Sequence, residues 1–246
     1  SARTECAVLL ALCRVLYLTG LGDVPFYTRG EPREGNVVRE MLTTGQWLVP
    51  ERPEGEPARK PPLYYWTAAV AWAAMPDAAE YALRLPSALF AIAGVLGTWV
   101  VTRIAIGPAA AWPAALVLAT AFEWTRAAVS ARVDMTLTAG TTLVFLGWTL
   151  VLARGGQGGL WLAALGAVLG ILAKGPVAVV LPGIAVVGLA LWERDRGIVW
   201  RLRAPLVLGG AGLGIAAWYA AAIAQEGPAY LDVLIGENLL RFVDAD

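Results

Sequence analysis

The sequence predicts an all-α integral membrane protein with about seven transmembrane helices. Of its 246 residues, 58% are apolar and only 15% are charged, whereas roughly 25% are charged in soluble domains. The charged residues also recur after charge-free intervals of 18 to 22 residues. At about 1.5 Å per helical residue, one such interval spans the hydrocarbon core of a bilayer. We expect these intervals to be helical because lipid leaves no other partner for backbone polar groups.

The charge-free intervals give the order of the expected spans. The first apolar segment carries Arg14 and is the only expected span with an internal charge. All seven belong to one transmembrane domain over residues 1–246. The spans are predicted at about 7–22, 84–103, 104–123, 135–153, 155–173, 176–192 and 204–225.

A polar stretch separates the first span from the second. Residues 23–60 hold 13 of the 38 charged side chains, in a segment too long for a simple connector. Within this stretch, residues 35–44 carry Val37, Val38 and Met41 at helical spacing, which predicts one short helix. Long loops of this kind usually serve function.

Residues 61–76 decide the topology. Prolines at both ends leave about 13 residues for a helix, which is short for a span, and the aromatic residues within it suit the membrane interface. The sequence favours a juxtamembrane helix here, so that the first external loop covers residues 23–82, whereas a true span would invert everything downstream. In the favoured topology, the bias of positive charge makes one face cytoplasmic. That face carries Arg103, Arg154, Arg194, Arg196, Arg201 and Arg203.

Composition excludes several functional classes. The chain has no histidine, which excludes histidine-based acid–base catalysis and Ser–His or Cys–His nucleophile pairs. Its two cysteines, Cys6 and Cys13, cannot form a disulfide framework or a zinc ribbon. Because 19 basic residues balance 19 acidic ones, net charge does not point to a nucleic acid.

The opposite, external face gathers both carboxylates and cations at the lipid boundary. Such a set suits a reaction on a phosphorylated lipid, in which cations hold the phosphate and a carboxylate accepts a proton. Any one of these charges could equally serve only to end a helix and anchor it in headgroups. The residues gathered there are Glu31, Arg33, Glu34, Lys60, Arg132, Asp134, Lys174, Glu237 and Arg241.

Seven short motifs in order resemble the polyprenyl-phosphate-dependent glycosyltransferases of the GT-C fold class. The resemblance is to the bacterial branch with the lipid A aminoarabinose transferases and relatives of protein O-mannosyltransferases, of the glycosyltransferase family 39 type. Each motif alone is weak, but their order and spacing are specific. The motifs are at residues 30–41, 45–50, 60–66, 84–89, 132–134, 172–176 and 237–242.

The resemblance also implies which residues form the active site. Glu31 is expected to be the catalytic base and Asp134 a second catalytic acidic residue, while Lys60 and Lys174 bind the lipid phosphate. Two departures stand out: Gly30 replaces the first acid of an Asp–Glu pair, and Arg59 replaces an acid before Lys60. The resemblance leaves room for a divalent metal, although no ligand set is visible and no cofactor is certain. The other substrate-binding residues it implies are Arg33, Tyr64, Arg84, Arg132, Glu237 and Arg241.

The expected function is that of an inverting hexosyl- or pentosyltransferase in the bacterial inner membrane, with its active site facing the periplasm or exterior. Its donor is a sugar on a polyprenyl phosphate such as undecaprenyl phosphate, and its acceptor a lipid, glycan or protein of the cell envelope, as in lipid A modification. The alternative is a non-catalytic multi-span protein such as a transporter or flippase component. Because family members continue with further spans and a soluble domain, we expect the chain to be an N-terminal fragment.

Overall fold

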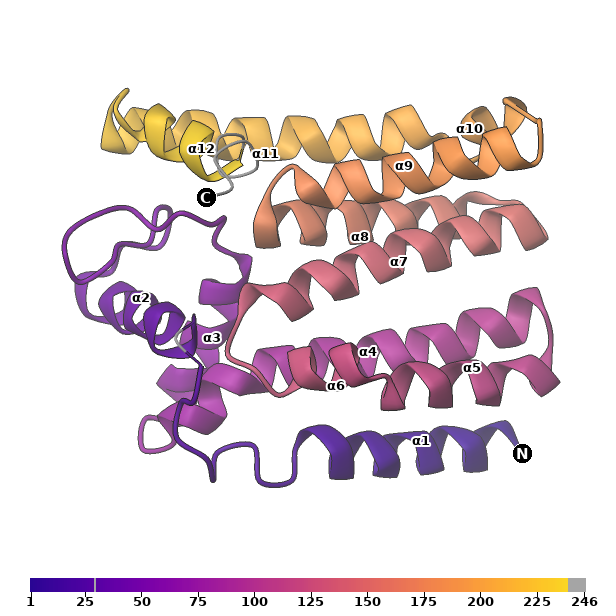
Figure 1. Ribbon diagram of the computed structural model, residues 1–246, viewed down its shortest axis with the longest axis horizontal. Coiled ribbons are helices and arrows are strands. Elements are labelled where there is room, and N and C mark those ends of the chain that lie inside the picture. Colours follow the sequence, from indigo (N-terminus) through magenta and orange to yellow (C-terminus); the bar gives the residue numbers. More distant parts are fainter. Residues whose placement is uncertain (29, 239–246) are drawn as a thin grey trace.

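The computed structural model describes residues 1–28 and 30–238. Every regular element in this part of the chain is a helix, apart from one isolated β-bridge between Glu51 and Pro57. Figure 1 shows the long helices lying side by side as a bundle, with short helices and loops gathered at one end. The prediction of an all-α protein is therefore confirmed.

The apolar helices of the bundle differ in length. α4, α7, α8 and α11 are each long and apolar enough to cross a membrane, and α5 and α9 are shorter apolar helices. That the chain crosses the membrane seven times remains a prediction. The helices of the bundle are α1 (Ala2–Tyr17), α4 (Ala79–Ala105), α5 (Pro108–Thr120), α6 (Phe122–Ala128), α7 (Val133–Arg154), α8 (Gln157–Lys174), α9 (Val177–Trp192) and α11 (Ala204–Glu226).

Some helices end at other residues than the expected spans do, because glycines end a helix or reverse the chain there. α1 ends at Tyr17 rather than near residue 22, and Gly20 follows with a φ of +69°. α4 continues through Ala105, after which Gly107 at a φ of +136° lets the chain turn before Pro108 begins α5. The span expected at 104–123 is therefore a shorter helix, which α6 extends after a break at residue 121.

Glycines bring α7 and α8 into close contact. A side chain at Gly140 would place its Cβ 2.5 Å from the backbone nitrogen of Gly170, and one at Gly147 would lie 2.4 Å from the carbonyl of Gly159. Only residues without a Cβ allow the two backbones to approach this closely in lipid. This contact fixes how α7 and α8 present their ends, where Asp134 and Lys174 lie.

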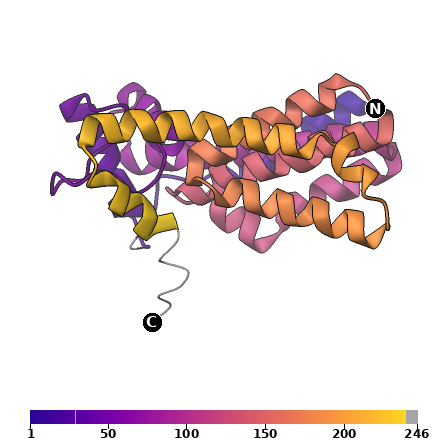
Figure 2. The ribbon, with the colours of Figure 1, turned by 90° about the horizontal axis from the view of Figure 1, so that it is seen from above.

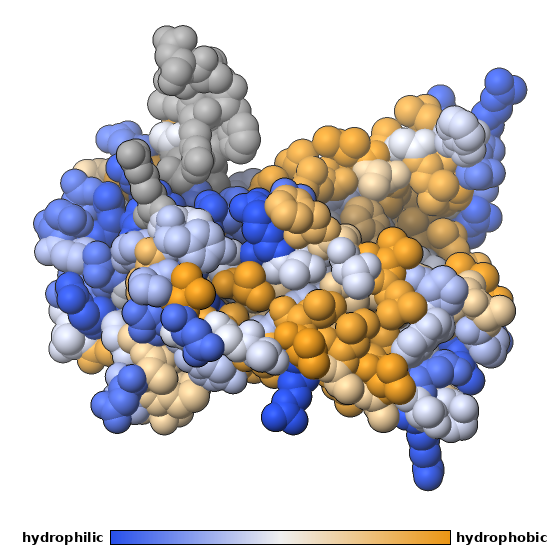
Figure 3. Space-filling view, turned by 60° about the horizontal axis from the view of Figure 1, so that its bottom comes forward, coloured by the Kyte–Doolittle hydropathy of each residue, from blue (hydrophilic) through white to orange (hydrophobic). Residues whose placement is uncertain are grey.

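The two ends of the bundle differ in the elements that they carry. The polar end comprises α2 (Gly30–Thr44), α3 (Leu63–Ala74), α12 (Tyr230–Asn238) and the connections before α7 and after α8. The arginine end comprises Arg103, Arg154 and residues 193–203, which include α10 (Gly197–Arg201). Figures 1 and 2 place these ends at opposite extremes of the long axis. Hydrophilic side chains cover the polar end, and an apolar surface lies between the ends (Figure 3).

The short helices of the polar end correspond only partly to the predictions. α2 begins at Gly30 rather than at residue 35, because proline is tolerated in the first turn of a helix and Pro32 lies there. As a result, Glu31 and Glu34 lie one turn apart on the same helix. The short helix expected within residues 61–76 is present as α3, with 12 residues. That α3 stays outside the membrane remains a prediction.

Hydrogen bonds attach the polar loop to the last helices. The indole Nε1 of Trp218 on α11 donates to the carbonyl of Leu48 at 3.0 Å. The hydroxyl of Tyr230 on α12 donates to the carbonyl of Ala58 at 3.2 Å. The loop is therefore held between α2 and α3 on one side and α11 and α12 on the other.

Candidate active site

A buried ion pair lies beneath the surface of the polar end. Arg84 on α4 donates from Nε to Oε1 of Glu31 at 2.9 Å and from Nη2 to Oε2 at 3.3 Å. The backbone N–H of Ala131 also donates to Oε1 of Glu31, at 3.0 Å. The exposed fractions of Glu31 and Arg84 are 0% and 2%. The pair thus joins α2, α4 and the connection between α6 and α7.

The remaining donors of Arg84 hold the start of the polar loop. Its Nη1 donates to the carbonyls of Leu21 at 2.9 Å and Val24 at 2.7 Å, and its Nη2 donates to that of Pro25 at 3.3 Å. The guanidinium also lies 5.3 Å from the ring centroid of Phe26. A buried charge costs several kcal/mol unless it is paired and hydrogen-bonded, and Arg84 meets both conditions. Arg84, which the sequence placed among the substrate-binding residues, thus uses its donors on groups of the protein, and its role in substrate binding remains a prediction.

The surroundings of Glu31 keep its carboxylate ionised. Burial by itself raises the pKa of Glu31, but the guanidinium of Arg84 and the amide of Ala131 outweigh burial and hold that pKa below its ordinary value. The carboxylate of Glu31 is thus fully buried, is held by three donors and is not among the residues that line the cavity described below. Glu31 is placed to fix the connection that precedes Arg132 and Asp134.

A second charged group lies at the surface of the polar end. Nζ of Lys174, at the end of α8, lies 2.6 Å from Oδ1 of Asp134, at the start of α7. Nε of Arg132 lies 3.2 Å from the other carboxylate oxygen of Asp134. All three side chains are about one-third exposed. The structure thus brings together three residues that the sequence predicted to share a site.

Gly30 lies against this surface group. A Cβ at Gly30 would lie 3.1 Å from Nε of Arg132, which is close enough to require a small shift of the arginine. Gly30 is the position where the family resemblance leads us to expect an acid. In this chain the guanidinium of Arg132 packs against that position, and α2 therefore contacts the surface group.

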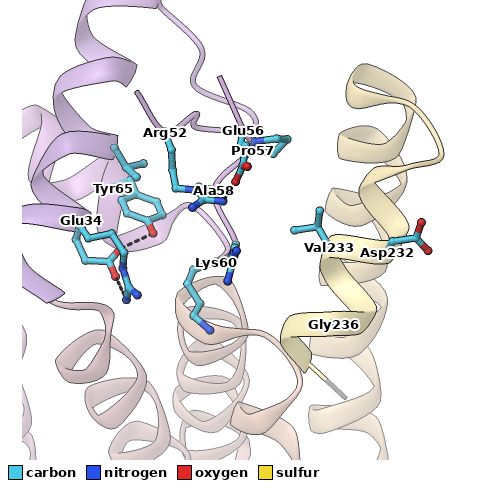
Figure 4. Close-up of a pocket in the computed structure, with 13 residues that line it drawn as sticks. Glu34, Arg52, Glu56, Pro57, Ala58, Lys60, Tyr65, Asp232, Val233 and Gly236 are labelled. Atoms are coloured by element: carbon cyan, nitrogen blue, oxygen red, sulfur yellow. Dashed lines mark hydrogen bonds and ion pairs between the residues drawn. The ribbon is translucent and has the colours of Figure 1, made fainter. Parts of the chain in front are cut away.

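A cavity of about 990 Å³ opens between the polar loop, α2, α3 and α12. Figure 4 shows Glu34 and Tyr65 on one wall, with Val233 and Gly236 of α12 on the opposite side. Four basic and three acidic side chains line the cavity, and Arg52 forms an ion pair with Glu56. The lining residues are Arg33, Glu34, Val37, Arg52, Glu56, Pro57, Ala58, Arg59, Lys60, Tyr65, Asp232, Val233 and Gly236.

Some predicted substrate-binding residues line the cavity and others do not. Arg33 and Lys60 are on its wall. Tyr64 is not, because its ring is fully buried and its hydroxyl donates to the carbonyl of Leu83 at 2.9 Å. Tyr64 therefore packs in the interior of the polar end instead. The side chain of Glu237, and Arg241 as a whole, lie outside the described residues.

The sequence placed Glu34 on the external face but indicated neither a role for it nor its contact with Tyr65. The hydroxyl of Tyr65 donates to Oε2 of Glu34 at 2.6 Å, and Nη2 of Arg33 donates to Oε1 at 2.9 Å. Glu34 follows Glu31 by one helical turn, a spacing that marks it as a second candidate acid on the same helix. Two further basic residues of the wall that the sequence did not single out, Arg52 and Arg59, occur in the charge-rich part of the loop.

The described part of the chain provides no ligand set for the divalent metal that the resemblance leaves room for. Within residues 1–28 and 30–238, no three acidic or cysteine side chains converge on a point where an ion would bind.

Comparison with known proteins gives consistent matches. The family model described as dolichyl-phosphate-mannose-protein mannosyltransferase matches residues 59–221. The chain is 29% identical over 242 residues to the undecaprenyl phosphate-alpha-4-amino-4-deoxy-L-arabinose arabinosyl transferase of Edwardsiella ictaluri, covering 96% of this chain and 43% of that protein. To the transferase 1 of the same name from Pseudomonas fluorescens it is 27% identical over 249 residues, covering 97% and 44%.

The fold has a solved counterpart. The crystal structure of ArnT from Cupriavidus metallidurans bound to undecaprenyl phosphate matches with a TM-score of 0.84 and 25% sequence identity. The match covers 97% of this chain and 45% of that one. The chain thus spans less than half the length of the relatives that it matches. The agreement over nearly all of this chain confirms the ArnT-like membrane fold expected from the motifs.

Proposed function

This chain belongs to the dolichyl-phosphate-mannose-protein mannosyltransferase family, and on that premise we propose that it transfers a sugar from a polyprenyl-phosphate carrier to a lipid, glycan or protein acceptor. We place the reaction at the polar end, on the extracytoplasmic face of the bacterial cell membrane. The observation that carries the proposal is the cavity lined by Arg33, Arg52, Arg59 and Lys60, at the end of a bundle of apolar helices.

The donor class follows from chemistry and from the relatives. A long isoprenoid chain is soluble only among apolar helices, whereas its phosphate needs cations at the membrane surface. Two relatives are named as undecaprenyl phosphate-aminoarabinose transferases, and the ArnT structure holds undecaprenyl phosphate. A polyprenyl-phosphate sugar satisfies both requirements at the polar end.

The orientation rests on the distribution of positive charge. Arg194, Arg196, Arg201 and Arg203 are all exposed in the short connection at the arginine end. Short loops rich in arginine remain on the cytoplasmic side during membrane insertion. The polar end then faces outward, away from the cytoplasm.

The proposed reaction is a direct displacement at the anomeric carbon. An oxygen of the acceptor attacks that carbon and inverts its configuration, while the bond from the anomeric carbon to the phosphate oxygen breaks and the electron pair leaves with the phosphate. Lys60, Lys174 and Arg132 stabilise the departing phosphate by charge-assisted hydrogen bonds. Asp134 holds Lys174 and Arg132 in place through its two carboxylate oxygens.

Glu31 serves this reaction through the framework. It binds the backbone of Ala131, directly before Arg132, and pairs with Arg84 on α4. The position of Arg132 relative to the donor phosphate thus depends on the buried pair. In this proposal Glu31 is a positioning residue, in contrast to the catalytic role expected from the resemblance.

The alternative of a transporter or flippase component has weaker support. Transport paths usually place polar or ionisable groups near the middle of membrane helices. In α4, α7, α8 and α11, the charged side chains lie near the helix ends. The relatives with assigned names are transferases.

Transfer by the purified protein in lipid nanodiscs tests the function. The protein is incubated with radiolabelled undecaprenyl-phosphate sugars and a membrane extract as the source of acceptor, and the labelled product is separated from the donor. We expect transfer from the polyprenyl-phosphate sugar and none from a nucleotide sugar. Folded protein that transfers label from no polyprenyl-phosphate sugar would contradict the proposal.

The variant Lys174→Ala tests whether Lys174 binds the phosphate of the donor. Because it removes a cation that binds the leaving phosphate, we expect the KM for the lipid donor to rise by about tenfold, the equivalent of one charge-assisted hydrogen bond. Arg196→Ala, which removes a cation at the arginine end, is the matched control and should leave that KM unchanged. An equal effect of the two variants would remove Lys174 from the site.

A further inference from the structure

Two glutamates on α2 lie one turn apart in different surroundings. Glu31 points into the framework, where Arg84 and the amide of Ala131 hold it. Both side chains are largely buried, with exposed fractions of 0% for Glu31 and 3% for Glu34, but Glu34 lines the cavity and Glu31 does not. Only Glu34 of the two is therefore placed to meet a molecule bound in the cavity.

The hydrogen bonds of Glu34 orient its carboxylate without saturating it. Tyr65 donates to Oε2 at 2.6 Å and Arg33 donates to Oε1 at 2.9 Å. A carboxylate offers about four lone-pair sites, so each oxygen keeps the capacity to accept another hydrogen bond. Figure 4 shows Glu34 and Tyr65 joined in this way on the cavity wall.

Tyr65 is a fixed donor in this pair. Burial and the negative charge of Glu34 raise the pKa of the Tyr65 phenol well above its ordinary value, so the phenol stays protonated. Its ring is 2% exposed and lies edge-on to that of Tyr64, at a centroid distance of 5.8 Å. A rigid, protonated donor fixes the direction in which the carboxylate faces the cavity.

We propose that Glu34, oriented by Tyr65, is the proton acceptor of the transfer reaction, and that the acceptor substrate presents a hydroxyl group to it. This inference rests on the proposed function. The acceptor oxygen forms its bond to the anomeric carbon as its proton passes to Glu34. The bond between the anomeric carbon and the phosphate oxygen breaks, and the phosphate keeps the electron pair. A second proton transfer, from Glu34 to water, completes the cycle.

The hydroxyl follows from the chemistry of the carboxylate. A hydroxyl is a weak nucleophile that gains from a base as it attacks. An ionised phosphate oxygen needs no base, and the negative charge of Glu34 would repel it. A carboxylate held ready on the cavity wall therefore favours acceptors that are alcohols over acceptors that are phosphates.

The test is a steady-state comparison of variants with undecaprenyl-phosphate sugars as donor and two probes as acceptor. The probes are dodecyl maltoside, which offers only hydroxyls, and dodecyl phosphate, which offers a phosphate oxygen. We expect the wild type to prefer dodecyl maltoside. Glu34→Gln should lower kcat with that acceptor by about 100-fold or more, the usual contribution of a general base, while the donor KM stays unchanged.

Three further variants separate catalysis from folding. Glu40→Gln makes the same change on α2 away from the cavity and should retain the wild-type kcat. Glu34→Asp keeps a carboxylate and should recover part of the activity. Tyr65→Phe leaves Glu34 intact and should lower kcat by about tenfold, as expected for losing one strong hydrogen bond to a charged group. If Glu34→Gln does not fold, the kcat of Tyr65→Phe tests the role of Glu34 in its place.

The outcomes distinguish this inference from the proposed function. If the wild type and Glu40→Gln transfer sugar neither to the probes, nor to water, nor to an acceptor in the membrane extract, the proposed function fails and the role of Glu34 fails with it. If both are active and Glu34→Gln keeps their kcat, the function stands and Glu34 is not the proton acceptor. The same conclusion follows if Glu34→Gln is inactive but Glu34→Asp and Tyr65→Phe show no graded effect. A wild type that prefers dodecyl phosphate would overturn the inferred acceptor class.

Discussion

At the polar end, one ion pair is buried and joins segments that are distant in sequence, whereas at the arginine end an exposed ion pair joins residues that are close in sequence. Glu31 and Arg84 lie 53 positions apart and are 0% and 2% exposed. Arg201 and Asp195 lie six positions apart, and their side chains are 59% and 43% exposed. Because burying a charge costs several kcal/mol, a buried pair survives only where full hydrogen bonding offsets that cost.

The difference indicates that charged residues have different roles at the two ends. A buried pair that is also hydrogen-bonded to the backbone of Leu21, Val24, Pro25 and Ala131 holds the polar end in one arrangement, which a reaction site requires. The exposed arginines of the opposite end remain available to water and to lipid headgroups. The same residue types thus serve as framework at one end and as a membrane-facing surface at the other.

The largest expected effect is on the buried pair. Arg84→Met leaves Glu31 buried without its counter-charge, and we expect it to lower the free energy of unfolding by about 3–5 kcal/mol. The double variant Glu31→Gln/Arg84→Met should recover part of that loss. Chemical unfolding in detergent measures both values.

The matched change at the arginine end is Arg103→Met. Arg103 pairs with Glu5 at 3.0 Å, and the two side chains are about 30% exposed. Partly exposed pairs contribute about 1 kcal/mol or less, so this variant should unfold almost as the wild type does. Equal losses for Arg84→Met and Arg103→Met would remove the distinction between the two ends.

The pH dependence of stability gives a smaller effect with a definite sign. The pKa of Glu31 lies below its ordinary value of 4.5 in the folded protein. A carboxyl of this kind adds stability at pH values above its unfolded pKa, and that stability is lost as the pH falls through the folded pKa. The unfolding temperature should therefore fall between about pH 5 and about pH 3. In Glu31→Gln this part of the dependence should be absent, and an unchanged profile would show that the pKa of Glu31 is not lowered.

A small effect is also expected for Tyr64. Its buried hydroxyl makes one hydrogen bond to the carbonyl of Leu83. We expect Tyr64→Phe to lower the free energy of unfolding by about 1 kcal/mol, the usual contribution of such a bond. A loss several times larger, measured by the same chemical unfolding, would indicate that Tyr64 has a further role at the polar end.

The sequence predicted which charges share an end, because the charge-free intervals set where each helix begins and ends. Asp134 and Lys174 meet for this reason, one at the start of α7 and the other at the end of α8. The intervals could not predict that α2 begins at Gly30, since its first turn is polar and contains proline. The onset of α2 therefore became visible only in the structure.

The sequence also could not predict the direction in which neighbouring side chains point. Glu31 and Glu34, like Tyr64 and Tyr65, are close on one helix, so local pattern alone does not tell which of each pair reaches the cavity. Helix rotation decides this, and contacts with a distant segment set the rotation. For α2 that contact is Arg84, which lies on α4.

The most direct test of the account is the side of the membrane from which each end is accessible. Cys6 and Cys13 are replaced by serine, and single cysteines are introduced by Glu56→Cys, Asp134→Cys and Arg196→Cys for labelling with a membrane-impermeant thiol reagent in intact cells. We predict that Glu56→Cys and Asp134→Cys react from outside, and that Arg196→Cys reacts only after the membrane is opened. If Asp134→Cys reacts from the same side as Arg196→Cys and not with Glu56→Cys, the polar end does not face one compartment and the proposed site does not exist.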